Sequence, residues 1–155
     1  MIDFAQQYHY GVRVPDIEAA MDELSRGLGV TWCTLQEREQ GLWTPDRGQH
    51  SVKLKFTYSQ QGPVHIELLQ GEPGSIWYGN DLPGIHHAGI WSDDVPGDTE
   101  ALLAQGWTLA LAQVSPDEGY GAYTYLVSPS GLIVEPVTSL ARPRFDIWFA
   151  GGELG

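Results

Sequence analysis

Residues 8–16 read YHYGVRVPD, and residues 86–94 read HHAGIWSDD. Each stretch holds a histidine, one further residue, a glycine and then a β-branched apolar residue, and each leads into a sequence that favours a helix. His9 and His87 occupy the same place in the two stretches. A local pattern that recurs in this way indicates an internal repeat of one supersecondary unit.

Each histidine is followed, later in its half of the chain, by a glutamate inside an apolar run. Glu67 lies in VHIELL (residues 64–69) and Glu135 in LIVEPV (residues 132–137). A carboxylate buried in an apolar strand costs several kcal/mol unless it is paired or bound to a metal. Two imidazoles and two carboxylates suit a Ni, Co, Zn, Mn or Fe ion better than an all-oxygen calcium site. The sequence therefore predicts one divalent metal ion, with the ligands His9, Glu67, His87 and Glu135.

Composition excludes several classes of partner. The chain has 155 residues, of which 42% are hydrophobic, and this length suits one domain with a substantial core. A formal net charge of -12 argues against nucleic acid or an anionic membrane as partner, because both are bound by basic patches. The lone Cys33 excludes an internal disulfide, and the sequence shows no targeting or membrane-spanning pattern. We expect a cytoplasmic protein.

Hydrophobic spacing and turn residues predict the order strand, helix, strand, strand, strand in each half. In the first half a helix begins after Asp16 and ends at Gly29, with strands expected at 30–36, 51–58 and 63–70. In the second half we expect strands at 85–92, 107–114, 122–128 and 132–137, and a helix at 96–105. The aromatic tail around residues 142–149 is expected to pack on the body or on another subunit, and residues from 151 onward are expected to fray.

The repeated strand order resembles that of the glyoxalase, bleomycin-resistance and dioxygenase superfamily, also called vicinal oxygen chelate proteins. The resemblance spans roughly residues 8–137 and also rests on the two His-x-Gly openings, the Glu-Leu-Leu run at 67–69 and the Ser-Pro-Ser-Gly turn at 128–131. It implies an α+β fold in which two βαβββ modules, 8–70 and 84–137, form a cupped mixed sheet with helices on the outer face. The single domain 1–155 would end in a tail at 138–155.

The same resemblance implies that the four metal ligands are those predicted above. Glyoxalase I enzymes are similar in using a His, Glu, His, Glu set, whereas methylmalonyl-CoA epimerases usually have Gln at the second place. Ring-cleaving dioxygenases typically use two His and one Glu, so Glu67 argues against that group.

Two polar residues are expected on the strand faces of the metal ligands. Arg13 shares a face with His9 and would clamp a substrate carboxylate, or would instead pair with Glu37 or Glu39. His65 precedes its glutamate by two residues, and would orient a ligand or touch the substrate.

Other candidate substrate contacts lie at the rim or wall of the expected cup. His50 falls where the resemblance places the carboxylate base of methylmalonyl-CoA epimerases, although a solvated histidine at the start of a strand is the alternative. Three aromatic residues would line a pocket or belong to the core: Trp91, Tyr123 and Tyr125.

The predicted site suits the abstraction of a proton next to a carbonyl. A metal that binds two adjacent substrate oxygens lowers the cost of an enediolate, and Glu135 and Glu67 are the expected proton carriers. The expected enzyme is a lyase, isomerase or epimerase acting on a small molecule. Two alternatives stay open: a binding protein that sequesters a planar ligand in the same fold, and an Fe-dependent dioxygenase in which Glu67 is not a ligand.

A homodimer is also expected. Trp148 and Phe149 in the tail, together with the edges of two half-open sheets, would leave apolar surface that a monomer of this size cannot easily cover.

Overall fold

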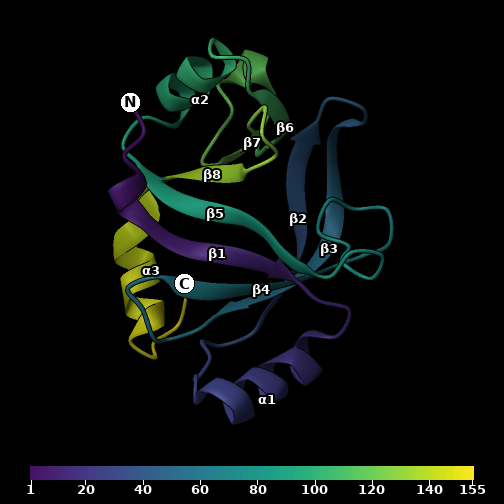
Figure 1. The fold of residues 1–155 in the computed structure, drawn as a ribbon, viewed down its shortest axis with the longest axis vertical. Helices are drawn as coiled ribbons and strands as arrows, with labels where there is room; N and C mark the ends of the chain where they lie inside the picture. Colours follow the sequence, from purple (N-terminus) through teal and green to yellow (C-terminus); the bar gives the residue numbers. More distant parts are fainter. The chain divides into compact units, whose positions relative to one another are not determined.

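The structure is a computed structural model that describes all residues 1–155 (Figure 1). The first half contains β1 (Gln7–Arg13), α1 (Ile17–Leu28), β2 (Gln36–Thr44), β3 (Gly48–Tyr58) and β4 (His65–Gly71). The second half contains β5 (Gly84–Ser92), α2 (Val95–Leu103), β6 (Thr108–Ala112), β7 (Thr124–Val127) and β8 (Ile133–Thr138), and α3 (Arg142–Phe149) follows. Short 3-10 turns lie at Phe4–Gln6, Pro116–Glu118 and Ser139–Ala141. The predicted α+β class is confirmed, and both halves have the expected order of elements.

The strands form a mixed sheet, as expected. Their hydrogen-bonded order is β1-β4-β3-β2-β6-β7-β8-β5. The pairs β1/β4 and β5/β8 are parallel, whereas β3/β4, β2/β6, β6/β7 and β7/β8 are antiparallel. In each half, therefore, the first and last strands of the repeat lie side by side and run in the same direction.

Contacts along the chain define two compact units whose boundaries differ from those of the two sequence halves. Unit 1 comprises Met1–Tyr8, Gly41–Ser51 and His87–Arg142, and unit 2 comprises His9–Gln40, Val52–His86 and Pro143–Gly155. The turn between β2 and β3 belongs to unit 1, and almost all of α3 belongs to unit 2.

In unit 2, α1 forms where the sequence predicts it. The Asp16 side chain accepts a hydrogen bond from the Ala19 amide at 3.1 Å, and Gly29 ends the helix in the left-handed region with φ 70°. Ile17 packs against Ile66 and Leu68 of β4 on one face of the sheet. Because side chains alternate along a strand, the residues between and beside these two point to the opposite face.

In unit 1, α2 has the same relation to its own strands. The Asp94 side chain accepts a hydrogen bond from the Gly97 amide at 3.0 Å at the start of the helix. Leu102 packs with a buried group from three strands, Ile90, Leu126 and Val134. Each helix thus covers one face of its strands and leaves the other face to the predicted ligands. None of the helices combines the length and the apolar composition needed to span a bilayer.

The C-terminal segment packs on its own chain. The Trp148 side chain is fully buried, and its ring meets that of Phe56 edge-on, with 5.8 Å between centroids. The prediction that the last residues fray is wrong, because Leu154 is buried. Hydrogen bonds from the amides of Gly151 and Gly152 to carbonyls of α3 close the helix and turn the chain back. Since Trp148 is covered within the chain, the tail no longer argues for a homodimer, which stays a prediction.

One strand was predicted in the wrong place. Before residue 36 the predicted segment 30–36 contributes only an isolated bridge between Trp32 and Ser59, and the strand is β2, at Gln36–Thr44. The first part of β2 is exposed and charged, so it lacks the apolar alternation by which a strand is recognised. Its partners in the sheet, rather than its own composition, keep this segment extended.

Candidate metal centre

The first histidine and glutamate form a buried pair in unit 2. β1 and β4 are aligned so that His9 lies level with His65, and Gly11 with Glu67. The Nε2 atom of His9 is 3.3 Å from the Oε1 atom of Glu67. His9 is 0% exposed and Glu67 is 7% exposed, so the imidazole is the polar partner that this buried carboxylate needs.

The second histidine and glutamate form the same pair in unit 1. β5 and β8 are aligned so that Gly89 lies level with Glu135. The Nε2 atom of His87 is 3.5 Å from the Oε2 atom of Glu135, and both residues are buried. In both units a glycine two residues after the histidine stands opposite the glutamate. Because glycine has no side chain, it leaves room beside each carboxylate.

A tyrosine on the neighbouring strand completes the arrangement in unit 2, and sequence reasoning missed it. Tyr58 of β3 is level with Glu67. Its ring meets the His9 ring edge-on at 5.1 Å, and its hydroxyl oxygen is 3.5 Å from the Nδ1 atom of His9. This contact places a hydroxyl beside the Nδ1 atom of His9, whereas the Nε2 atom is the one beside Glu67.

Tyr125 of β7 takes the corresponding place in unit 1. The bridge between Tyr123 and Val137 and the pairing of Leu126 with Val134 put Tyr125 level with the glutamate of its unit. Its ring centroid is 4.6 Å from that of His87. Tyr125 was predicted to line a pocket or to belong to the core; it is buried beside His87, and its role toward a substrate remains a prediction.

The sequence does contain a signal for this pair of tyrosines. An aromatic residue, a threonine and a tyrosine follow one another at 56–58 and again at 123–125. Both threonines are fully buried on the reverse face, where Thr57 donates to the Cys33 carbonyl at 2.7 Å and Thr124 shares a hydrogen bond with Thr99 at 2.8 Å. Comparing the two halves position by position would have identified Tyr58.

His65 lies on the same strand face as the first pair, as predicted. Its Nδ1–H donates to the Ser59 carbonyl at 2.6 Å, and its ring stacks on that of Phe149 at 3.7 Å with 13° between planes. Burial lowers the pKa of His65, against the opposing effect of the Ser59 hydrogen bond. This histidine therefore holds α3 beside the first pair.

The rings of α3 also surround Tyr58. Their centroids lie 5.6 Å (Phe145), 5.4 Å (Trp148) and 5.7 Å (Phe149) from that of Tyr58. Because Tyr58 and His65 flank the first pair on one sheet face, α3 lies over the face of unit 2 that carries His9 and Glu67. Figure 1 shows this helix, in yellow, at the end of the chain.

Comparison with known sequences and folds agrees with this architecture. The sequence profile of the Glyoxalase/Bleomycin resistance protein/Dioxygenase superfamily matches residues 8–125. The chain belongs to this superfamily. The matched residues include His9, Glu67 and His87, whereas Glu135 lies beyond them. A search of curated protein sequences finds no significant match.

Several solved structures share the superfamily fold. A hypothetical protein, BH1468 from Bacillus halodurans, has a TM-score of 0.62 and 17% identity over 86% of this chain and 93% of its own. Methylmalonyl-CoA epimerase from Mycobacterium tuberculosis has a TM-score of 0.57 and 17% identity over 89% of this chain and 92% of its own. A mutant of 4-hydroxymandelate synthase from Streptomyces coelicolor has a TM-score of 0.57 and 16% identity over 86% of this chain but 37% of its own.

Arg13 makes contacts other than those expected within the superfamily site. Its guanidinium donates to the carbonyls of Ile76 at 3.0 Å and Leu82 at 3.4 Å. A Cβ added at Gly79 would come within 2.6 Å of the Arg13 Cβ, so the loop passes very close to this side chain. Arg13 therefore braces the loop between β4 and β5, and the predicted partners Glu37 and Glu39 are not the groups it contacts.

The remaining predicted substrate contacts have local partners. The Nδ1–H of His50 donates to the Gly48 carbonyl at 2.8 Å, within the start of β3. Trp91 stacks on Tyr8, with 3.7 Å between ring centroids and 8° between planes. The Tyr123 hydroxyl donates to the Gly41 carbonyl at 3.1 Å. These contacts give each side chain a structural role, and their roles toward a substrate remain predictions.

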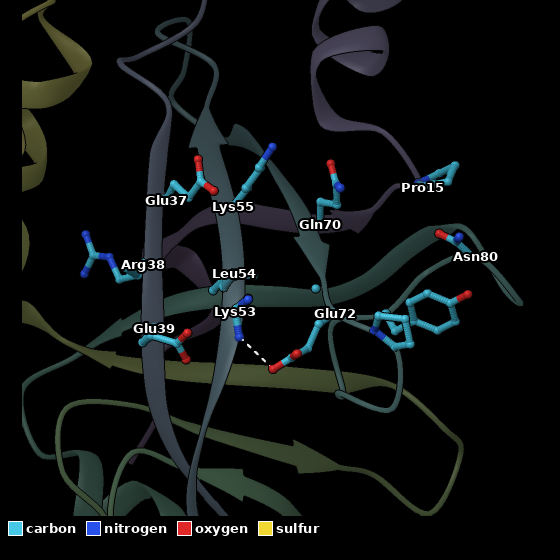
Figure 2. A pocket seen from close by; sticks show the side chains of 13 residues that line it. Pro15, Glu37, Arg38, Glu39, Lys53, Leu54, Lys55, Gln70, Glu72 and Asn80 are labelled. Atoms are coloured by element: carbon cyan, nitrogen blue, oxygen red, sulfur yellow. Dashed lines mark hydrogen bonds between the residues drawn. The ribbon is translucent and has the colours of Figure 1, made fainter.

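Unit 2 also has a cavity of about 510 Å³, whose lining residues include neither His9 nor Glu67. Figure 2 shows the residues that line it. Glutamates and lysines from neighbouring strands line it, among them Glu37, Lys53, Lys55 and Glu72. Both lysines are on the face of β3 opposite that of Tyr58, because their positions differ from it by odd numbers of residues. The cavity therefore lies on the reverse face of the strands and mixes charges of both signs.

Proposed function

We propose that the chain is a metal-dependent lyase, isomerase or epimerase that removes a proton next to a carbonyl. The observation that carries this proposal is the repetition of one buried His–Glu pair in the same strand register, at 3.3 Å in unit 2 and 3.5 Å in unit 1. The proposed ligands are His9, Glu67, His87 and Glu135, with His9, His87 and Glu135 as the strongest candidates.

The donor chemistry fits a divalent transition metal. Imidazole nitrogen and carboxylate oxygen are the usual ligands of Zn, Ni, Co, Mn and Fe ions, and two carboxylates balance the charge of such an ion. All four side chains are buried, and the Nε2 atom of each histidine lies beside the carboxylate of its own pair. A metal ion would also resolve the cost of burying two carboxylates in apolar strands.

The proposed chemistry is divided between the metal and the glutamates. A divalent ion bound by two adjacent substrate oxygens would lower the cost of removing the proton from the carbon beside the carbonyl. Glu135 and Glu67 would carry that proton, because each is a buried carboxylate beside a proposed histidine ligand of the ion. Burial keeps bulk water away from both carboxylates and strengthens this electrostatic coupling.

Metal binding is the first test. We expect metal-free protein to take up one Co²⁺ per chain, with visible absorption bands of a nitrogen and oxygen site. Elemental analysis of protein purified without a histidine tag should show one transition metal per chain. Protein that stays free of metal and fully stable would instead favour the ligand-sequestering alternative.

Proton exchange is the second test. Metal-loaded protein should exchange the α-proton of a substrate with solvent deuterium, and we would screen methylmalonyl-CoA and the hemithioacetal of methylglyoxal and glutathione by NMR. Glu135→Gln keeps an oxygen ligand and removes the base, so exchange should fall by about a hundredfold or more. Full exchange by the Glu135→Gln protein would assign the proton to another group.

A further inference from the structure

We infer that α3 forms an aromatic wall of the substrate pocket and selects substrates that carry a flat apolar group next to the two chelating oxygens. This inference rests on the proposed function, since it takes the His9–Glu67 pair as part of the metal centre. Its own support lies in the contacts of Phe145 and Phe149.

Tyr58 and His65 lie between the aromatic wall and the first pair and contact both. The Tyr58 hydroxyl is 3.5 Å from the Nδ1 atom of His9, and the Tyr58 ring is 5.6 Å from that of Phe145 and 5.7 Å from that of Phe149. Phe149 also stacks on His65, which is level with His9 across β1 and β4. The rings of α3 are therefore separated from His9 by the Tyr58 ring and flank the sheet face that carries the first pair.

The wall is fixed in position. Trp148 anchors α3 in the core, and Leu154 is buried after the chain turns back. Phe145 and Phe149 are only half-buried, so each ring keeps part of its surface exposed. Rigid aromatic side chains provide contact area at low conformational cost, which favours their use in binding.

The chemistry of this wall favours an aryl group over a small or polar one. Aromatic rings prefer offset-stacked or edge-to-face partners, and such pairs add to the gain from apolar burial. The Arg144 guanidinium carbon lies 5.8 Å above the Phe145 ring, which places a cation at the exposed edge of the wall. An anionic substrate with an aryl substituent would match both features.

Two 2-oxo acids form a matched pair of probes. Pyruvate and phenylglyoxylate offer the same adjacent carbonyl and carboxylate oxygens and differ in a methyl or a phenyl group. We would titrate each into Co²⁺-loaded protein by calorimetry and follow the Co²⁺ absorption bands. We expect phenylglyoxylate to bind at least about tenfold more tightly than pyruvate.

Variants of α3 assign the preference to the wall. Phe149→Ala and Phe145→Ala should each weaken phenylglyoxylate binding about three- to tenfold and leave pyruvate binding unchanged. Phe149→Leu keeps apolar volume without a flat ring and should show part of the same loss. Ile147→Ala, at an exposed position of the same helix, is the matched control and should bind both acids as the unmodified protein does.

The outcomes separate this inference from the function on which it rests. If the unmodified protein takes up no Co²⁺ or binds neither acid through it, the proposed metal enzyme fails first. If it binds both acids equally, or if Phe149→Ala, Phe145→Ala and Phe149→Leu fold and keep the preference for phenylglyoxylate, the aromatic wall is overturned and the metal centre stands. Circular dichroism and thermal unfolding show which variants are folded.

Discussion

The two His–Glu pairs are alike in their strands and differ in what lies beside them. In both units a glycine stands opposite the glutamate, and a tyrosine on the neighbouring strand lies beside the histidine. In unit 2 the rings of α3 then pack on Tyr58 and His65. Tyr123 of unit 1 and Phe56 of unit 2 hold equivalent positions in the repeat. The Tyr123 hydroxyl donates to a main-chain carbonyl, whereas the Phe56 ring contacts Trp148 of α3.

The two units therefore share the residues of the His–Glu pairs and differ in the aromatic residues around them. The preserved residues include the proposed metal ligands, which occupy equivalent positions in the parallel strand pairs of the two units. The varied residues surround one pair with aromatic rings. The contacts of α3 therefore distinguish the surroundings of the pair in unit 2 from those of the pair in unit 1.

Removing the anchor of α3 should have the largest effect. Trp148→Ala leaves a cavity over Phe56 and Tyr58, and we expect it to lower the free energy of unfolding by about 3–5 kcal/mol. In unit 1, Tyr123→Phe removes one hydrogen bond and should cost only about 1 kcal/mol. Urea unfolding monitored by circular dichroism measures both values.

A conservative variant controls for the indole itself. The Nε1–H of Trp148 is buried without a hydrogen-bond partner, so Trp148→Phe should cost much less than Trp148→Ala. Equal losses for Trp148→Ala and Tyr123→Phe would show that α3 adds little to the stability of unit 2.

Replacing the histidines tests whether the two pairs serve one ion. His9→Ala and His87→Ala each remove one ligand, and we expect each to lower Co²⁺ affinity by at least about a hundredfold, more than loss of an outer partner does. Calorimetry and the Co²⁺ absorption bands give the affinity and the stoichiometry. If one variant keeps full affinity, the pairs do not share a centre and their similarity reflects folding alone.

The sequence predicted the elements whose signals are local. Asp16 and Gly29 mark both ends of α1, and the structure places the helix between them. β2 was misplaced because its exposed, charged residues are held extended by neighbouring strands, which a single stretch of sequence does not reveal. The burial of Leu154 likewise depends on a turn after α3 that brings a distant core within reach.

In the candidate site, too, local patterns predicted some residues and tertiary contacts determined others. His9 and His87 could be selected because each begins a repeated local pattern, and the pairing with the glutamates followed from strand faces. Tyr58 required an alignment of the two halves, and the contact of α3 with Tyr58 required the tertiary structure. The guanidinium of Arg13 has the expected strand face, but its partners belong to a loop whose path no local pattern fixes.

The tyrosines offer a finer test of the asymmetry. Tyr58→Phe removes the hydroxyl 3.5 Å from the Nδ1 atom of His9, and we expect about a tenfold loss of Co²⁺ affinity, as for other outer partners of metal ligands. Tyr125→Phe keeps the ring beside His87 and should change affinity less than threefold. Competition with a Co²⁺ indicator dye measures both, and equal losses would make the two tyrosines equivalent.

The smallest expected effect concerns His65, which occupies a strand position that Ile133 takes in unit 1. Burial lowers the pKa of His65 below its ordinary value of 6.5, so the unfolded chain binds a proton at a higher pH than the folded protein does. Stability should consequently fall as the pH drops from above 6.5 toward the lower folded pKa of this histidine. His65→Ile removes this contribution and makes unit 2 resemble unit 1.

Between pH 7.5 and pH 5.5, the unmodified protein should lose up to roughly 1 kcal/mol more stability than the His65→Ile protein. Urea unfolding at the two pH values gives this difference directly, because the other titrating groups are common to both proteins. Identical losses would mean that protonation of His65 is accommodated on its stack with Phe149.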